Sequence, residues 1–166
     1  MAPIRSPGAS AACTPVSPRR LVASVLARLE REGYHGFEAI DLGVSPELPF
    51  VLVGKRELEH AFFGVLASLA NEPGWGEDVS IDAWDSEEDV ALGICINAAV
   101  LSGGLTLLRK AVEAHGGGML CQSENARRYQ ITLVLPAVRH SRISIARQSW
   151  TRLTVSACGR ERELQD

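Results

Sequence analysis

The stretch Leu101–Leu120, LSGGLTLLRKAVEAHGGGML, decides the fold of this chain. A glycine pair precedes leucine and valine residues at helical spacing, and His115 with three glycines ends that run before an apolar segment. Glycines at both ends of an apolar periodic run are typical of a short helix bounded by tight turns. The pattern therefore predicts a helix over Leu105–His115 that leads directly into a strand.

Outward from this stretch, the sequence predicts two more helices and several strands. Apolar residues at i, i+3/i+4 spacing predict one helix that begins near Pro18 and stops at Gly33, and a second that begins at Lys55 and stops before Pro73. An extended segment with a Ser-Pro turn separates these helices. The alternating runs DVSIDAW, DVALGICIN, GMLCQS and YQITLVLPA predict two antiparallel strand pairs.

The order is helix, strand, helix, strand, strand, helix, strand, strand. It predicts the α+β class: a two-layer α/β sandwich in which about three helices cover one face of a mixed, mainly antiparallel sheet. Residues 1–18 hold four of the eight prolines and are expected to form a disordered lead before a domain over 19–137. Residues 138–166 carry six arginines, and a docked strand and a disordered tail are both consistent with them.

The composition excludes several classes of function. An apolar content of 46%, with 22% charged residues and a net charge of −3, fits a globular domain and gives no basic surface for nucleic acid. No apolar run approaches the roughly 18 residues that span a membrane, and no secretory leader is recognisable, so we expect a cytoplasmic protein.

The cysteines form no C-x-x-C pair and have no histidine at metal-ligand spacing. We therefore expect no metal site, and structural or incidental thiols, with a cluster assembled from distant positions as the alternative. These cysteines are Cys13, Cys95, Cys121 and Cys158.

Two segments resemble the catalytic, ATP-binding domain of sensor histidine kinases, whose fold is shared with gyrase, Hsp90 and MutL (the GHKL superfamily). LRKAVEAHGGGMLCQSENARRYQITLVLPA resembles the closing helix, His-Gly-Gly turn and strand pair of that domain. PELPFVLVGKRELEHAFFGVL resembles the run into its metal-binding helix. The resemblance covers Pro18 to Ala137 and implies the sandwich fold described above.

In that family, two asparagines on the central helix bind Mg²⁺ and phosphates, and a carboxylate after the central strand binds adenine. The asparagine positions fall on Gly64 and Ser68 here, with Asn71 one turn beyond as a substitute or a helix cap. The carboxylate position has no Asp, and Asn97 there is either a base-binding amide or a turn residue. The resemblance therefore implies a site that lacks its metal ligands and its base-binding carboxylate.

The family also has a long mobile lid and a Gly-x-Gly box that binds phosphates. Only residues 98–101 separate Asn97 from Ser102, which is too short for a lid. The box reads Ser102, Gly103 and Gly104, so backbone N–H groups at this helix start either bind an anion or serve a tight turn. We therefore expect no bound cofactor, with ATP and Mg²⁺ only if this altered site is still active.

No histidine stands in the context of a phosphoacceptor, which the family carries on an upstream helical hairpin. The four are His35, His60, His115 and His140. The leading hypothesis is a non-catalytic, pseudokinase-like module that regulates two-component signalling by binding a histidine kinase or a response regulator. Candidate apolar anchors are Phe62, Phe63 and Trp75, with burial in the core as the alternative reading.

Other functions remain open on this evidence. They are a histidine phosphotransferase-like relay, a divergent ATPase or anti-sigma-type kinase of the same fold, and a vestigial fragment. A homodimer is also compatible with the sequence.

Overall fold

The computed structural model describes residues 13–70, 75–97, 104–125 and 128–139. The elements follow the predicted order, except that a short strand is added at the beginning, and a 3-10 helix and two short strands replace the single strand predicted between the first two long helices. They are β1 (Thr14–Val16), α1 (Pro18–Arg31), the 3-10 helix η1 (Phe37–Ala39), β2 (Asp41–Val44), β3 (Val51–Val53), α2 (Lys55–Leu69), β4 (Val79–Ser86), β5 (Asp89–Asn97), α3 (Gly104–Glu113), β6 (Gly118–Asn125) and β7 (Arg128–Pro136).

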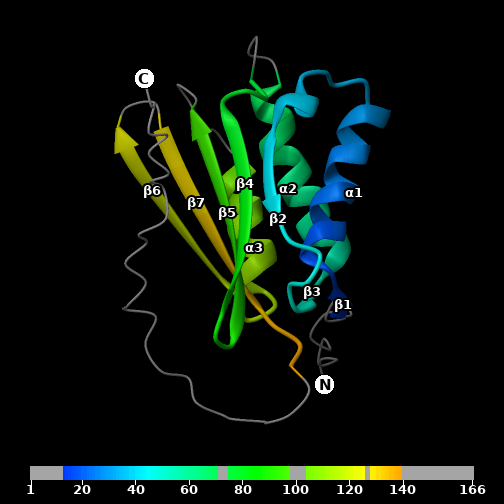
Figure 1. The fold of residues 1–166 in the computed structure, drawn as a ribbon, viewed down its shortest axis with the longest axis vertical. Helices are drawn as coiled ribbons and strands as arrows, with labels where there is room; N and C mark the ends of the chain where they lie inside the picture. Colours follow the sequence, from blue (N-terminus) through cyan, green and yellow to red (C-terminus); the bar gives the residue numbers. More distant parts are fainter. Residues whose placement is uncertain (1–12, 71–74, 98–103, 126–127, 140–166) are drawn as a thin grey trace, which may run out of the picture.

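The main sheet has five strands in the order β2-β4-β5-β7-β6, and α1, α2 and α3 lie on one side of it (Figure 1). β2 pairs with β4 in parallel, and the other neighbours are antiparallel. A small separate sheet joins β1 and β3. The predicted sandwich with a mixed, mainly antiparallel sheet is therefore confirmed.

The helices begin and end close to the predicted positions, although α3 spans Gly104–Glu113 rather than Leu105–His115. Pro18 opens α1, a position where its missing N–H costs nothing. Gly33 ends this helix with a φ of 83°, and the N–H of Tyr34 then donates to the carbonyl of Leu29 at 3.0 Å. A side chain at such a φ is strained, so the glycine fixes the end of α1.

The core lies between the sheet and the helix layer. Every second residue of the central strands faces the helices, including Ile81, Leu92, Ile94, Ile131 and Leu133, which are all fully buried. The helices contribute their apolar stripes, of which the largest fully buried members are Leu21, Leu29, Leu58, Phe62, Leu66 and Leu108. This one continuous cluster joins all three helices to the sheet.

Two expectations need correction. β1 lies inside residues 1–18, which were expected to be disordered, because Thr14–Val16 pairs with Val51–Val53 and Val16 joins the core. The proposed anchors are also core residues: Phe62, Phe63 and Trp75 are only 0%, 8% and 4% exposed, so they are not available to a partner on this surface.

Some expectations fall outside the described residues. The two readings of the arginine-rich tail are among them, since the described chain ends at Arg139. In the described part of the chain, no helix is long and apolar enough to cross a membrane.

Candidate functional site

The described positions taken from the kinase resemblance lie on α2, at the end of β5 and at the start of α3, where α3 packs on α2. The two helices are in direct contact there: a Cβ on Gly104 would lie 3.1 Å from Cγ2 of Val65 and 3.3 Å from its Cα and N. Gly104 therefore lets the first turn of α3 rest on the backbone of α2. Its neighbours Ser102 and Gly103 lie outside the described residues.

The two positions at which the kinase family binds metal lie on α2 beside this contact. Gly64 is half-buried and has no side chain, and a Cβ placed there would meet nothing within 4 Å. The hydroxyl of Ser68 donates to the carbonyl of Val65 at 2.7 Å, one helical turn back. Mg²⁺ requires several oxygen ligands at short distance, and these two positions supply a single hydroxyl. Asn71 lies outside the described residues.

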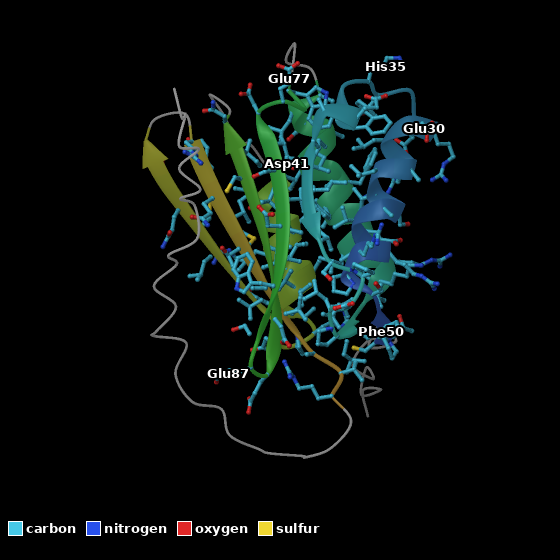
Figure 2. All side chains as sticks on the ribbon, in the orientation of Figure 1. Glu30, His35, Asp41, Phe50, Glu77 and Glu87 are labelled. Carbon is cyan, nitrogen blue, oxygen red and sulfur yellow. The ribbon has the colours of Figure 1, made fainter. Side chains whose placement is uncertain are left out.

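Asn97 at the end of β5 is joined to the start of β4. Its backbone N–H donates to the carbonyl of Asp78 at 2.9 Å, and its side-chain amide donates to Oδ1 of Asp78 at 3.4 Å. Both side chains are exposed, at the end of the sheet where Figure 2 labels Glu77. The amide of Asn97 is thus partly occupied by a carboxylate.

Sequence reasoning missed Asp78 as a member of this site. The signal was the hairpin register: if Val79 pairs with Ile96, the residue before the first strand must face the end of the second. A carboxylate therefore lies next to the position that binds adenine in the kinase family, but immediately before β4.

The histidines of the described residues are placed apart. His115, at the end of α3, has its Nδ1 2.9 Å from Sγ of Cys13, and its ring packs over Gly54, where a Cβ would collide with it. The carbonyl of His35 accepts a hydrogen bond from the indole N–H of Trp75 at 2.7 Å. His60 is exposed on α2, and His140 lies outside the described residues.

No group of three or more His, Cys, Asp or Glu side chains in the described ranges is arranged to hold a metal ion. No disulfide joins the cysteines found there. Cys13 instead links the start of β1 to the end of α3 through His115.

One carboxyl group has a clearly perturbed pKa, and it lies at the opposite end of β5. Burial raises the pKa of Asp89, the charge of Glu88 raises it further, and Arg139 acts in the lowering direction. This end of the sheet carries the β4–β5 turn, where Figure 2 labels Glu87. The perturbation therefore belongs to the turn rather than to the junction of α2, β5 and α3.

The chain was compared with known proteins. No protein-family model matches it, and neither does any curated protein. The catalytic domain of the histidine kinase ThkA matches with a TM-score of 0.58 and 14% identity, over 75% of this chain and 95% of that domain. The ATP-binding domain of PrrB from Mycobacterium tuberculosis matches with a TM-score of 0.58 and 19% identity, over 76% of this chain and 98% of that domain.

A third similar structure is the histidine kinase AdeS from Acinetobacter baumannii, with a TM-score of 0.56 and 12% identity, over 76% of this chain and 68% of that one. Identities this low establish a shared fold. The chain therefore has the fold of histidine kinase ATP-binding domains, and the resemblance of its closing segment is confirmed at that level.

Proposed function

We propose that this chain is a non-catalytic module with the histidine kinase ATP-binding fold, which regulates cytoplasmic two-component signalling by binding a histidine kinase or a response regulator. The observation that carries the proposal is the absence of suitable metal-binding side chains at two positions of α2. Where the kinase family places two metal-binding amides, this helix has Gly64 with no side chain and Ser68 with its hydroxyl bonded to its own backbone.

The base-binding position supports the same proposal. A carboxylate accepts a hydrogen bond from the amino group of adenine, whereas the side-chain amide of Asn97 is engaged with Asp78. With the amide of Asn97 in place of the carboxylate, the hydrogen bond from the adenine amino group is lost, an interaction worth about 1–3 kcal/mol.

The start of α3 also supports it. Gly104 lies against Val65 so closely that neighbouring atoms would have to shift to admit even one methyl group. A glycine needed for this contact between two helices has a structural reason to be present without any phosphate.

A phosphotransfer role would require a nucleophilic histidine, and His60 is the exposed candidate on α2. Nη1 of Arg28 lies 3.2 Å from Nδ1 of His60. An arginine only donates, so Nδ1 must accept and the ring proton is on Nε2. In this tautomer the nucleophilic lone pair is on Nδ1, where the guanidinium of Arg28 engages it, which argues against the relay.

Titration of the full chain with a fluorescent ATP analogue, with and without Mg²⁺, tests the proposal. We expect no saturable binding, while the ATP-binding domain of PrrB serves as the positive control. Saturable micromolar binding that requires Mg²⁺ would refute the non-catalytic assignment and favour a divergent ATPase.

A second experiment tests the interaction. The purified chain is presented to a panel of histidine kinases and response regulators from its source organism, and binding and phosphotransfer are measured together. We expect saturable binding to one panel member and a changed rate of its phosphotransfer. Acid-labile phosphate on a histidine of this chain would instead establish a relay.

A further inference from the structure

A pocket of about 560 Å³ lies between α1 and α2. This volume is within the usual range for small-molecule sites, about 300–1,000 Å³. Its polar lining comes from two helical stripes, one on each helix: Ser24, Arg28 and Arg31 on α1, and Arg56, Glu59 and His60 on α2.

This pocket is separate from the junction of α2 with α3. Arg56, Glu59 and His60 follow one another at i, i+3 and i+4 and form one side of the helix. At about 100° per residue, Val65 projects from nearly the opposite side of α2. Since Val65 is the residue that touches Gly104, the pocket and the kinase-like positions use different sides of the same helix.

Arg28 is held in one orientation at the pocket wall. Its Nε donates to Oε1 of Glu32 at 2.7 Å, its Nη1 lies 3.2 Å from Nδ1 of His60, and its Cζ lies 3.9 Å from the centre of the Phe63 ring. These contacts engage Nε and Nη1 and leave the second amino group, Nη2, for another acceptor. A guanidinium fixed in this way loses little freedom when it binds an anion.

The charges around the pocket favour an anion. Three guanidinium groups, from Arg28, Arg31 and Arg56, are accompanied by Glu59 in the lining and by Glu32, which is bonded to Arg28, so positive charge remains in excess. The tautomer of His60 deduced above adds a neutral N–H donor at Nε2. Arginine forks match the oxygen geometry of phosphate groups especially well.

Glu59 adds a second requirement. It lines the pocket, but its Oε1 is enclosed by protein atoms with the ammonium of Lys55 3.8 Å away, so a ligand meets this carboxylate at its other oxygen, Oε2. A carboxylate would repel a bare phosphate, but it accepts a hydrogen bond from a hydroxyl group. The pocket therefore suits a ligand that has an anionic group at one end and hydroxyl donors at the other.

We propose that the pocket between α1 and α2 binds a small phosphorylated, hydroxyl-bearing molecule of the sugar phosphate class. Arg28, Arg31 and Arg56 hold the phosphate, and Glu59 accepts a hydrogen bond from a hydroxyl. This assignment does not depend on the proposed signalling role, because no residue of the kinase-like positions takes part.

Calorimetric titration of the full chain with ribose 5-phosphate tests the assignment, with ribose, inorganic phosphate and a phosphoserine peptide as comparison ligands. The test variants are Arg31→Gln and Arg56→Gln, whose side chains are exposed and whose loss leaves the core intact. Arg20→Gln is the matched control, because Arg20 is also exposed on α1 but does not line the pocket. Circular dichroism verifies that all variants fold.

We expect saturable binding of ribose 5-phosphate that weakens about tenfold or more in each test variant, as loss of one charge-assisted hydrogen bond predicts, and is unchanged in Arg20→Gln. Glu59→Gln should bring the affinity for ribose 5-phosphate closer to the affinity for inorganic phosphate. Three results would overturn the assignment: no saturable binding at millimolar ligand, equal affinity in the control and test variants, or tighter binding of the phosphoserine peptide than of the sugar phosphate.

Discussion

Replacing Gly104 with alanine tests the contact on which the packing of α3 depends. The new Cβ would lie 3.1 Å from Cγ2 of Val65 and 3.3 Å from its Cα and N. Carbon atoms prefer a separation of about 3.5–4.0 Å, so the two helices must move apart by a few tenths of an ångström. Two of the three contacted atoms belong to the backbone of α2 and cannot rotate away.

The expected change in the free energy of unfolding combines two opposing effects. Overpacking of this kind costs about 1–3 kcal/mol. The higher helix propensity of alanine returns at most about 1 kcal/mol, and less at the first residue of a helix. We therefore expect Gly104→Ala to lower the free energy of unfolding by about 1–2 kcal/mol.

Gly64→Ala is the matched control. Gly64 lies in the middle of α2, one residue from Val65, and a Cβ there meets nothing within 4 Å. The propensity gain therefore applies without a steric cost, and the variant should be more stable than the unmodified chain by about 0.5–1 kcal/mol.

Urea denaturation of the three proteins, followed by circular dichroism, measures both changes. Opposite signs for the two glycines support the reasoning. If Gly104→Ala is as stable as the unmodified chain or more so, then the helix contact tolerates a side chain and the structural explanation of this glycine is wrong.

Three further substitutions have defined outcomes. Trp75→Phe removes the indole hydrogen bond to the carbonyl of His35 and should cost about 1 kcal/mol in urea unfolding, and an unchanged midpoint would contradict that bond. Burial raises the pKa of Asp89, so the ionised form of this side chain destabilises the fold. Asp89→Asn should therefore be more stable than the unmodified chain at pH 7 and should lose this advantage as the pH falls through the raised pKa toward 3.8. A stability advantage that grows on acidification would refute this sign. Cys13→Ala removes the contact with His115, so amides of β1 should exchange hydrogen faster with little change in global stability, and unchanged exchange would mean that the contact does not hold the strand.

The elements with strong periodicity were predictable from the sequence. The stripe of α2 and the alternation of β4 and β5 extend over 15, 8 and 9 residues, so each pattern repeats several times. Such repeated patterns specify both the type of element and the face that it buries. The glycines at Gly33 and after His115 also identified two helix ends.

Features that depend on pairing between distant segments were not predictable. β1 has only three residues, and its partner β3 begins at Val51, so no local pattern reveals it. The pocket between α1 and α2 combines two stripes that look like ordinary charged helix surfaces until the helices are placed side by side. Arg31 and Arg56 come to line one pocket only through this packing.

The arrangement of α2 indicates that the stability of the fold does not depend on a bound nucleotide, as the proposed non-catalytic function requires. Its core side, which includes Phe62, Leu66 and Leu69, is buried, whereas Gly64 is half-buried and Ser68 is exposed. A ligand present at 100 times its dissociation constant stabilises a protein by about 2.7 kcal/mol, which is comparable with the burial of one or two large apolar side chains. The core has many such side chains on all three helices and on the sheet. Under the proposed function, the residues at the ligand positions can therefore differ from those of the kinases while the scaffold stays stable.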